Sequence, residues 1–230
     1  MVGEKAPRPA AEKTKPTGAA MGNHQVLLDC DNLQGVPGVC TEKDTDIIPS
    51  GKAFNYIPKQ EREHTIYGLL RENCDIHILT EEEPYTLSCY PVPLIWFFAY
   101  DSSGNYFGTL KEMGDIENQE IPVVYFNHIK RTYGKIAETM REFFSLVNFH
   151  PYWRRIIASE HHEPLNAIER MKNETDKLYV ERQGEIGAAL NLSNDVNAFD
   201  KLIERLHGDP GFMIYESKEQ AERAHQFIVL

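Results

Sequence analysis

Long apolar runs are absent from this sequence of 230 residues. The most apolar segment, residues 92–100, contains a proline and reaches about half of the roughly 20 residues that a membrane-spanning helix needs. The first residues carry charges and prolines where a signal peptide would have its apolar segment. We therefore expect a cytoplasmic protein with no membrane-spanning segment.

Cysteine is also scarce. The chain has four, Cys30, Cys40, Cys74 and Cys89, with no Cys-x-x-Cys pair and no Cys/His set spaced as in a zinc site. The even number leaves a disulfide open, but a cytosolic chain of this size does not need one, so we expect reduced, buried thiols. The sequence predicts neither a metal site nor a cofactor.

Short catalytic signatures are missing as well. The sequence has no Gly-x-Ser-x-Gly, no phosphate-binding Gly-x-x-x-x-Gly-Lys-Ser/Thr and no Gly-x-Gly-x-x-Gly. His161 and His162 would point about 100° apart on a helix, so we expect them to form a solvated patch with Glu163 and not a metal site. Cysteine–histidine catalysis assembled from distant segments stays open, although no local pattern supports it.

The segment VLLDCDNL, residues 26–33, resembles an enzyme motif. Phosphatases of the haloacid-dehalogenase type present a nucleophile and a neighbouring acid to magnesium from a strand that ends in Asp-x-Asp, as Asp29 and Asp31 would. That family has a threonine after the second aspartate, whereas Leu33 stands two positions on, and a Gly/Pro-rich loop follows in place of a doubly wound α/β pattern. We therefore favour a strand that ends in a solvated turn.

What the sequence has in excess is negative charge. Asp and Glu number 35 against 24 Lys and Arg, a formal net charge of −11. Such a field repels nucleic-acid phosphates and anionic membrane surfaces, and it attracts basic partners. The sequence therefore argues against nucleic-acid binding, and it leaves simple solubility and binding of a basic protein as the two explanations of the charge.

The chain divides into three expected regions. Residues 1–23 are rich in Pro, Ala, Lys and Gly and predict a disordered leader. Residues 24–150 predict an α+β domain with a mixed, mainly antiparallel sheet and packed helices, and residues 151–230 predict a mostly helical C-terminal extension. The expected strands of the domain are 25–28, 53–57, 75–79, 85–90, 92–100, 106–110 and 121–126, and its expected helices are 60–72 and 136–147.

The centre of the domain gives the clearest pattern. The continuous apolar run Val92–Tyr100, with Trp96 in its middle, predicts a strand that is buried on both faces. Asp101–Asn105 predicts a turn in which Gly104 takes the left-handed conformation, and 106–110 is the returning strand. After the strand 121–126, a turn that ends at Gly134 is expected to lead into the helix 136–147.

The C-terminal region is expected to be helical around one short strand. An amphipathic stretch begins at Trp153, and a later helix is expected to start after Asn194 or Asp195 and to end at Gly208. The apolar residues of that later helix are Val196, Phe199, Leu202, Ile203 and Leu206. The strand 212–215 then precedes a terminal helix that opens with the capping box Ser217-x-x-Gln220.

Three segments resemble the SUKH superfamily, which includes fungal cell-wall assembly regulators and many bacterial immunity proteins. PLIWFFAYDSSGNYFGTL, residues 93–110, resembles the central hairpin of the family. IPVVYFNHI, residues 121–129, resembles its next strand, and IAETMREFFSLV, residues 136–147, resembles its closing helix. These motifs define a sheet and a helix and not an active site, so the resemblance transfers no catalytic residue.

The resemblance implies a mixed sheet with helices on one side that binds other proteins. Bacterial members neutralise toxins, often nucleases, by direct binding, and an acidic chain suits a basic toxin. We therefore expect a non-catalytic immunity protein; the alternatives are a regulatory or scaffold protein of the same fold, or a magnesium-dependent phosphatase that uses Asp29 and Asp31. For a partner interface, the acidic residues near the turns are the candidates: Glu81, Glu82, Glu83 and Asp101.

Overall fold

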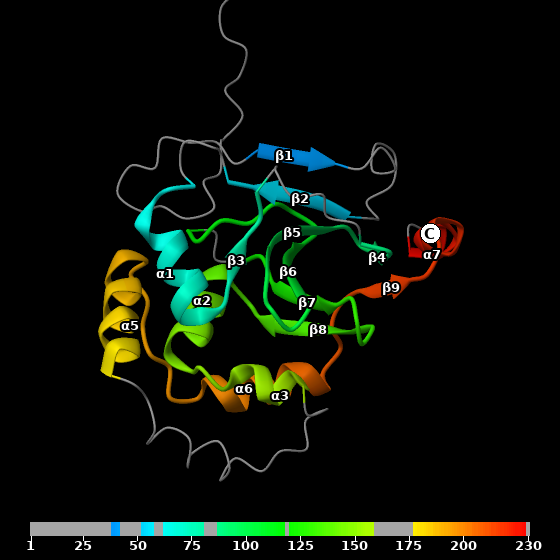
Figure 1. Ribbon diagram of the computed structural model, residues 1–230. Helices are drawn as coiled ribbons and strands as arrows, with labels where there is room; N and C mark the ends of the chain where they lie inside the picture. Colours follow the sequence, from blue (N-terminus) through cyan, green and yellow to red (C-terminus); the bar gives the residue numbers. More distant parts are fainter. Residues whose placement is uncertain are drawn as a thin grey trace, which may run out of the picture.

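A mixed, mainly antiparallel sheet of seven strands lies at the centre of the protein (Figure 1). The computed structural model describes residues 38–41, 52–57, 62–80, 87–117, 120–158 and 177–228. The strands are β1 (Gly38–Thr41), β2 (Lys52–Tyr56), β3 (His77–Ile78), β5 (Ile95–Tyr100), β6 (Asn105–Leu110), β7 (Val123–Asn127) and β8 (Thr132–Ala137). Their order is β1-β2-β5-β6-β7-β8, and β3 pairs with the part of β5 that follows the β2 pairing. Only the β2–β5 pair of this sheet is parallel, so the predicted class, α+β with a mainly antiparallel sheet, is confirmed.

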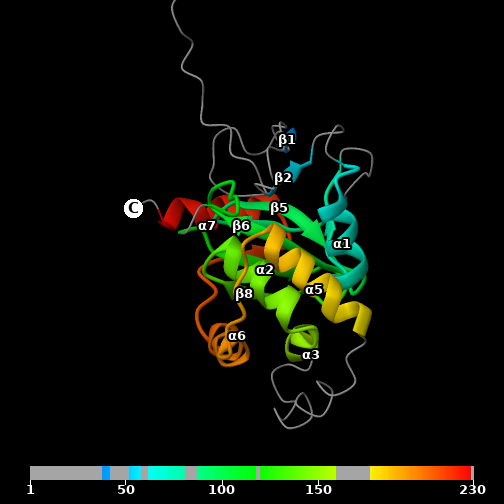
Figure 2. The same ribbon diagram turned by 90° about the vertical axis from the view of Figure 1, so that its left-hand side faces the viewer.

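Helices cover one face of this sheet, and a small second sheet lies on the other side. The helices are α1 (Thr65–Cys74), α2 (Met140–Phe149), α3 (Trp153–Ala158), α5 (Lys177–Ala189), α6 (Ala198–His207) and α7 (Lys218–Ile228). Figure 2 looks onto the face covered by α1, α2 and α5. Across the sheet, β4 (Tyr90–Val92) pairs with β9 (Met213–Tyr215), and α7 lies beside them (Figure 1).

The strand β5 has a hydrophobic core on each side. Phe98 faces the helices and packs against Phe143 and Phe144 of α2, at ring distances of 5.7 and 6.2 Å. Its neighbour Phe97 faces the opposite cluster. Both side chains are at most 1% exposed, which confirms the expected burial on both faces at this point of the strand.

The apolar run 92–100 is not one strand, however. It divides into β4, which ends at Val92, and β5, which begins at Ile95. Trp96 is therefore the second residue of β5 and is only half-buried, so its expected full burial is wrong. The strand expected at 85–90 is also displaced, since the described residues 87–89 are not a strand and pairing begins at Tyr90.

The chain forms a strand where the turn and the start of a helix were expected. Residues 132–137 are β8, which pairs with β7 in an antiparallel register, and α2 starts only at Met140. The hydroxyl oxygen of Thr139 accepts a hydrogen bond from the backbone N–H of Glu142 at 3.0 Å and so caps the helix. Ile136 belongs to the strand but faces the same core as α2, which explains why its spacing continues the helical pattern.

The C-terminal helices share the core of the sheet. Ile186 and Leu190 of the α5 region and Phe199 and Leu202 of α6 belong to the cluster that contains Phe98. The predicted division at residue 150 stays a prediction, but the two parts it separates are packed together. None of the helices in the described ranges is long and apolar enough to span a lipid bilayer.

The details of the last helices agree partly with expectation. α6 begins at Ala198, later than expected, so Val196 lies before it and is 87% exposed instead of on its apolar face. The helix ends at Gly208 as predicted. The strand expected at 212–215 is β9, and the Ser217 hydroxyl accepts the Gln220 N–H at 3.3 Å, as in the predicted capping box.

Candidate functional site

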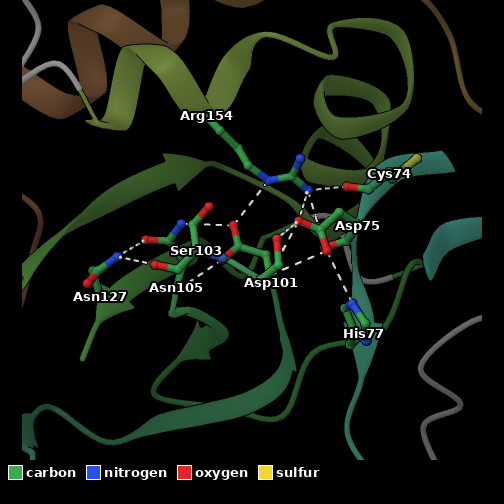
Figure 3. Close-up of polar contacts among 9 residues, drawn as sticks. Cys74, Asp75, His77, Asp101, Ser103, Asn105, Asn127 and Arg154 are labelled. Carbon is green, nitrogen blue, oxygen red and sulfur yellow. Dashed lines mark hydrogen bonds and ion pairs between the residues drawn. The ribbon is translucent and has the colours of Figure 1, made fainter. Parts of the chain in front are cut away.

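Polar side chains from three turns and one helix meet at one end of the sheet (Figure 3). The turns follow α1, join β5 to β6, and join β7 to β8, and the helix is α3. We call this set the turn network, and its members are Asp75, His77, Asp101, Ser102, Ser103, Asn105, Asn127 and Arg154.

The β5–β6 turn has the predicted form. Gly104 has a φ of +81°, and its N–H donates to the carbonyl of Asp101 at 3.2 Å. A Cβ atom at this position would come within 2.7 Å of the Ile129 side chain on the neighbouring turn, so only glycine fits without a shift. The turn therefore packs closely against the β7–β8 turn.

Asp101 lies in the middle of the network. One carboxylate oxygen accepts the backbone N–H groups of Ser103 at 2.9 Å and Asn105 at 3.0 Å. The other accepts the side-chain amide of Asn105 at 2.8 Å and Nε of Arg154 at 3.1 Å. The Asp101 side chain has no exposed surface, so its charge interacts with groups of the protein and not with solvent. This burial argues against the predicted direct contact of Asp101 with a partner.

Arg154 connects α3 to two turns. Besides its bond to Asp101, Nη2 donates to the backbone carbonyls of Cys74 and Asp75. Its guanidinium lies 3.6 Å from the Asp75 carboxylate and 5.1 Å from the centre of the Trp153 ring. A guanidinium is suited to this role because it offers several donors in a rigid plane.

The Cys74 thiol beside this site is not a reactive thiolate. Burial raises its pKa to about 12, and the nearby Arg154 charge opposes the rise only in part. At neutral pH the thiol is therefore protonated, whereas nucleophilic cysteines have lowered pKa values. Cys74 and Cys89 are both buried, as expected for these two thiols.

A serine, a histidine and an aspartate also meet here, but not in the catalytic order. The Ser102 hydroxyl donates to the Asp75 carboxylate at 2.5 Å, and Nε2 of His77 lies 3.2 Å from the other oxygen of Asp75. In a catalytic triad the histidine lies between the hydroxyl and the carboxylate, and here the carboxylate lies between. This arrangement holds the turns together and does not prepare the serine for attack. In the described ranges no group of three or more His, Cys, Asp or Glu side chains could hold a metal ion.

Asn127 extends the network to the β7–β8 turn. Its amide nitrogen donates to the Ser103 carbonyl at 3.0 Å and to Oδ1 of Asn105 at 2.9 Å. Its amide oxygen accepts the N–H groups of Ile129 at 3.1 Å and Lys130 at 2.8 Å. Neither Asn127 nor Arg154 was among the residues predicted from the sequence, although an asparagine at the end of a buried strand is a usual turn signal.

The remaining predicted site residues lie outside the described residues. These are Glu81, Glu82 and Glu83 of the acidic run, Asp29 and Asp31 of the phosphatase-like motif, and His161, His162 and Glu163. The acidic run begins directly after Thr80, which lines a hollow of about 460 Å³ beside α1 and β3.

Comparisons of the chain with protein-family models, with curated proteins and with solved structures found no match. The class that the structure defines is therefore an α+β protein with an open, mainly antiparallel sheet. The SUKH resemblance stays a prediction from the sequence.

Proposed function

We propose that this chain is a non-catalytic protein-binding module and, more specifically, a cytosolic immunity protein that binds and neutralises a basic toxin of the nuclease type. The observation that carries the proposal is the excess of exposed acidic side chains in the described part of the surface. They are Glu63, Glu72, Glu112, Glu117, Glu120, Glu138, Glu181, Glu185, Asp200, Glu204, Asp209, Glu216 and Glu219. The exposed basic side chains are fewer: Arg71, Lys111, Lys130, Arg131, Arg155, Lys201 and Arg223.

An acidic surface of this kind favours a basic partner by a simple mechanism. Complementary charge steers the encounter and raises the association rate, and like charge suppresses wrong partners such as nucleic acid. The turn network adds stiffness, because one connected set of hydrogen bonds joins three turns of the sheet to the helix α3. A stiff surface loses little conformational entropy on binding.

The acidic run Glu81–Glu83 is the proposed point of contact. It continues the chain from Thr80, at the hollow beside α1. Glu63 and Glu72 line the same hollow, but so do Arg62 and Arg71, so the described lining has equal numbers of carboxylates and guanidinium groups. The three glutamates of the acidic run would then give this side its negative charge. Asp101 is not part of this proposal, because its carboxylate is buried.

Binding and inhibition are tested with purified nuclease toxin domains. The full chain is immobilised and presented with a panel of basic nuclease domains and with acidic domains of similar size. We expect capture of a basic domain that weakens as salt rises from about 0.05 to 0.3 M, since screening shortens the reach of the charges. Loss of nuclease activity in the captured complex supports immunity, whereas capture without inhibition supports a scaffold or regulator. Failure to capture any basic domain contradicts the proposal.

The contact residues are tested by association kinetics. Replacing Glu81, Glu82 and Glu83 by Gln should slow association and flatten its salt dependence, with a smaller effect on dissociation. The matched control neutralises three exposed carboxylates elsewhere, Glu185, Glu204 and Glu216. Equal slowing by both triple variants would mean that overall charge acts and that the acidic run is not the contact.

A further inference from the structure

A positively charged hollow lies beside the turn network, although the chain as a whole is acidic. A hollow of about 250 Å³ lies between the β5–β6 turn, the β7–β8 turn and α3. Three cationic side chains line it, Lys130, Arg154 and Arg155, together with the hydroxyl residues Ser103 and Thr132. No Asp or Glu is among its described lining residues.

The net positive charge of this hollow comes from Lys130 and Arg155. Arg154 is balanced by its ion pairs with Asp101 and Asp75, which lie behind it in the turn network. Lys130 and Arg155 are exposed, and within the described ranges neither forms an ion pair with a carboxylate. The next basic residue of the turn, Arg131, is directed elsewhere, because its Nη1 donates to the Ser88 carbonyl at 2.6 Å.

The walls of the hollow are held in place before any ligand arrives. Asn127 accepts the Lys130 N–H at 2.8 Å and thereby fixes the turn that carries this lysine. Arg154 ties α3, which also carries Arg155, to the buried carboxylate of Asp101. Preorganised donors bind a ligand at a smaller entropic cost than donors on mobile segments.

We propose that this hollow binds a small oxyanion of the phosphate type, either inorganic phosphate or the phosphate group of a small metabolite. Guanidinium groups offer paired N–H donors that match tetrahedral oxyanions, and a lysine adds a compact charge. The volume lies just below the usual range for small-molecule sites, which suits a phosphate and a short substituent. A nucleic-acid strand is a poorer ligand, because the acidic surface beyond the hollow repels a chain of phosphates.

The proposal is tested by isothermal titration of the full chain with sodium phosphate, with sodium chloride at matched ionic strength as the blank. We expect saturable binding at one site. Lys130→Gln and Arg155→Gln should each raise the dissociation constant about tenfold or more, as expected for the loss of one charged hydrogen-bond donor. Arg223→Gln removes the same charge from an exposed position of α7 and should change it less than twofold.

Two further arms separate the sources of the phosphate group. Tighter binding of O-phosphoserine than of inorganic phosphate, with no binding of serine, assigns the site to a phosphorylated metabolite; the reverse order assigns it to free phosphate. Absence of saturable phosphate binding to the parent chain overturns the proposal. So does binding that Lys130→Gln and Arg155→Gln weaken no more than Arg223→Gln does. Because the two mutated side chains are exposed, melting temperatures should stay close to that of the parent and verify the fold.

Discussion

Asp101 shows how a single buried charge can set the geometry of several turns. Its two oxygens accept hydrogen bonds from Ser103, Asn105 and Arg154, and no part of the side chain reaches solvent. An amide in its place could accept on one side only, because its NH₂ group would face the donors of Asn105 and Arg154. The site is therefore built for a carboxylate.

Loss of the Asp101 charge should destabilise the protein. Asp101→Asn should lower the free energy of unfolding by about 3 kcal/mol, since it removes the buried charge that pairs with Arg154 and places an NH₂ group against two donors. Urea unfolding measures the change, with the exposed Glu185→Gln as the control for loss of one negative charge. A variant of unchanged stability that only loses a protein partner would show that Asp101 acts at an interface after all.

Cys74 leads to a prediction about alkaline pH. Burial raises the thiol pKa to about 12 in the folded protein, above its ordinary value of 9.0. Between these two values the unfolded chain releases the thiol proton more readily, so folding stability falls as pH rises and is unaffected by this group below pH 9. From pH 9 to 11 the parent should lose roughly 1 kcal/mol per pH unit more than Cys74→Ala does. Urea unfolding under reducing conditions gives the pH dependence of the unfolding free energy for both proteins. Equal slopes would contradict the raised pKa of the Cys74 thiol.

At the scale of elements, β5 is a central strand that pairs with β2, β3 and β6, and its residues differ in how deeply they are buried. Phe98 is 1% exposed and packs against two rings of α2, whereas Trp96 is half-buried near the start of the strand. Phe98→Ala should therefore cost about 3–5 kcal/mol of unfolding free energy, and Trp96→Ala roughly half of that. Chemical denaturation of the two variants measures which one loses more unfolding free energy. A larger loss for Trp96→Ala would mean that the apolar run is one continuous buried strand.

The start of α2 gives a second test at this scale. The Thr139 hydroxyl caps the helix by accepting the Glu142 N–H at 3.0 Å. Thr139→Ala should lower the unfolding free energy by about 1 kcal/mol, as is usual for the loss of an N-cap, whereas Thr139→Ser should restore most of it. If the helix instead began near Ile136, residue 139 would be inside it and alanine would be neutral or stabilising.

The sequence could predict those elements whose signal is local. The strand β5 is a continuous apolar and aromatic segment, and β7 is one up to its last residue. The turn between β5 and β6 carries Asp101 and Gly104 at the positions its geometry needs, so the returning strand β6 could be placed after it. The strand β8 could not be separated from α2, because Ile136 at the end of the strand and Met140 at the start of the helix face one core. Their spacing of four residues fits a helix equally well.

The candidate site was harder to predict for a related reason. The bond from Arg154 to the Cys74 carbonyl joins residues 80 positions apart, and that from Asn127 to Asn105 joins residues 22 apart. No local pattern encodes such contacts, since they depend on which turns the sheet brings together. Asp101 was selected from the sequence as an acidic turn residue, but its carboxylate has no exposed surface and pairs with Arg154 of α3, a contact that no local pattern in the sequence indicates.

At the scale of the whole molecule, the last third of the chain completes the core. Ile186, Leu190, Phe199 and Leu202 lie in the same cluster as Phe98, and β9 pairs with β4 on the other face. Arg205 of α6 adds polar contacts to the sheet and to α2: its Nη1 donates to the Ile136 carbonyl of β8 at 3.3 Å, and its Nη2 lies 2.9 Å from the Glu142 carboxylate. The C-terminal helices therefore cover surface that the first 150 residues cannot bury alone.

A chain that ends at residue 150 tests this dependence. It lacks Trp153 and Arg154 as well as α5 and α6, so it would expose the apolar face of α2 and leave the Asp101 carboxylate without its cation. We expect it to aggregate or to unfold without a cooperative transition, because the lost burial exceeds the usual stability margin of about 5–15 kcal/mol. Deletion of residues 1–23 is the matched control and should shift the melting temperature by no more than about 2 °C, since a segment of that composition buries little apolar surface. Circular dichroism with thermal melting compares the two, and cooperative melting of the 150-residue chain near the parent temperature would show that residues 151–230 are an appendage and not part of the folding unit.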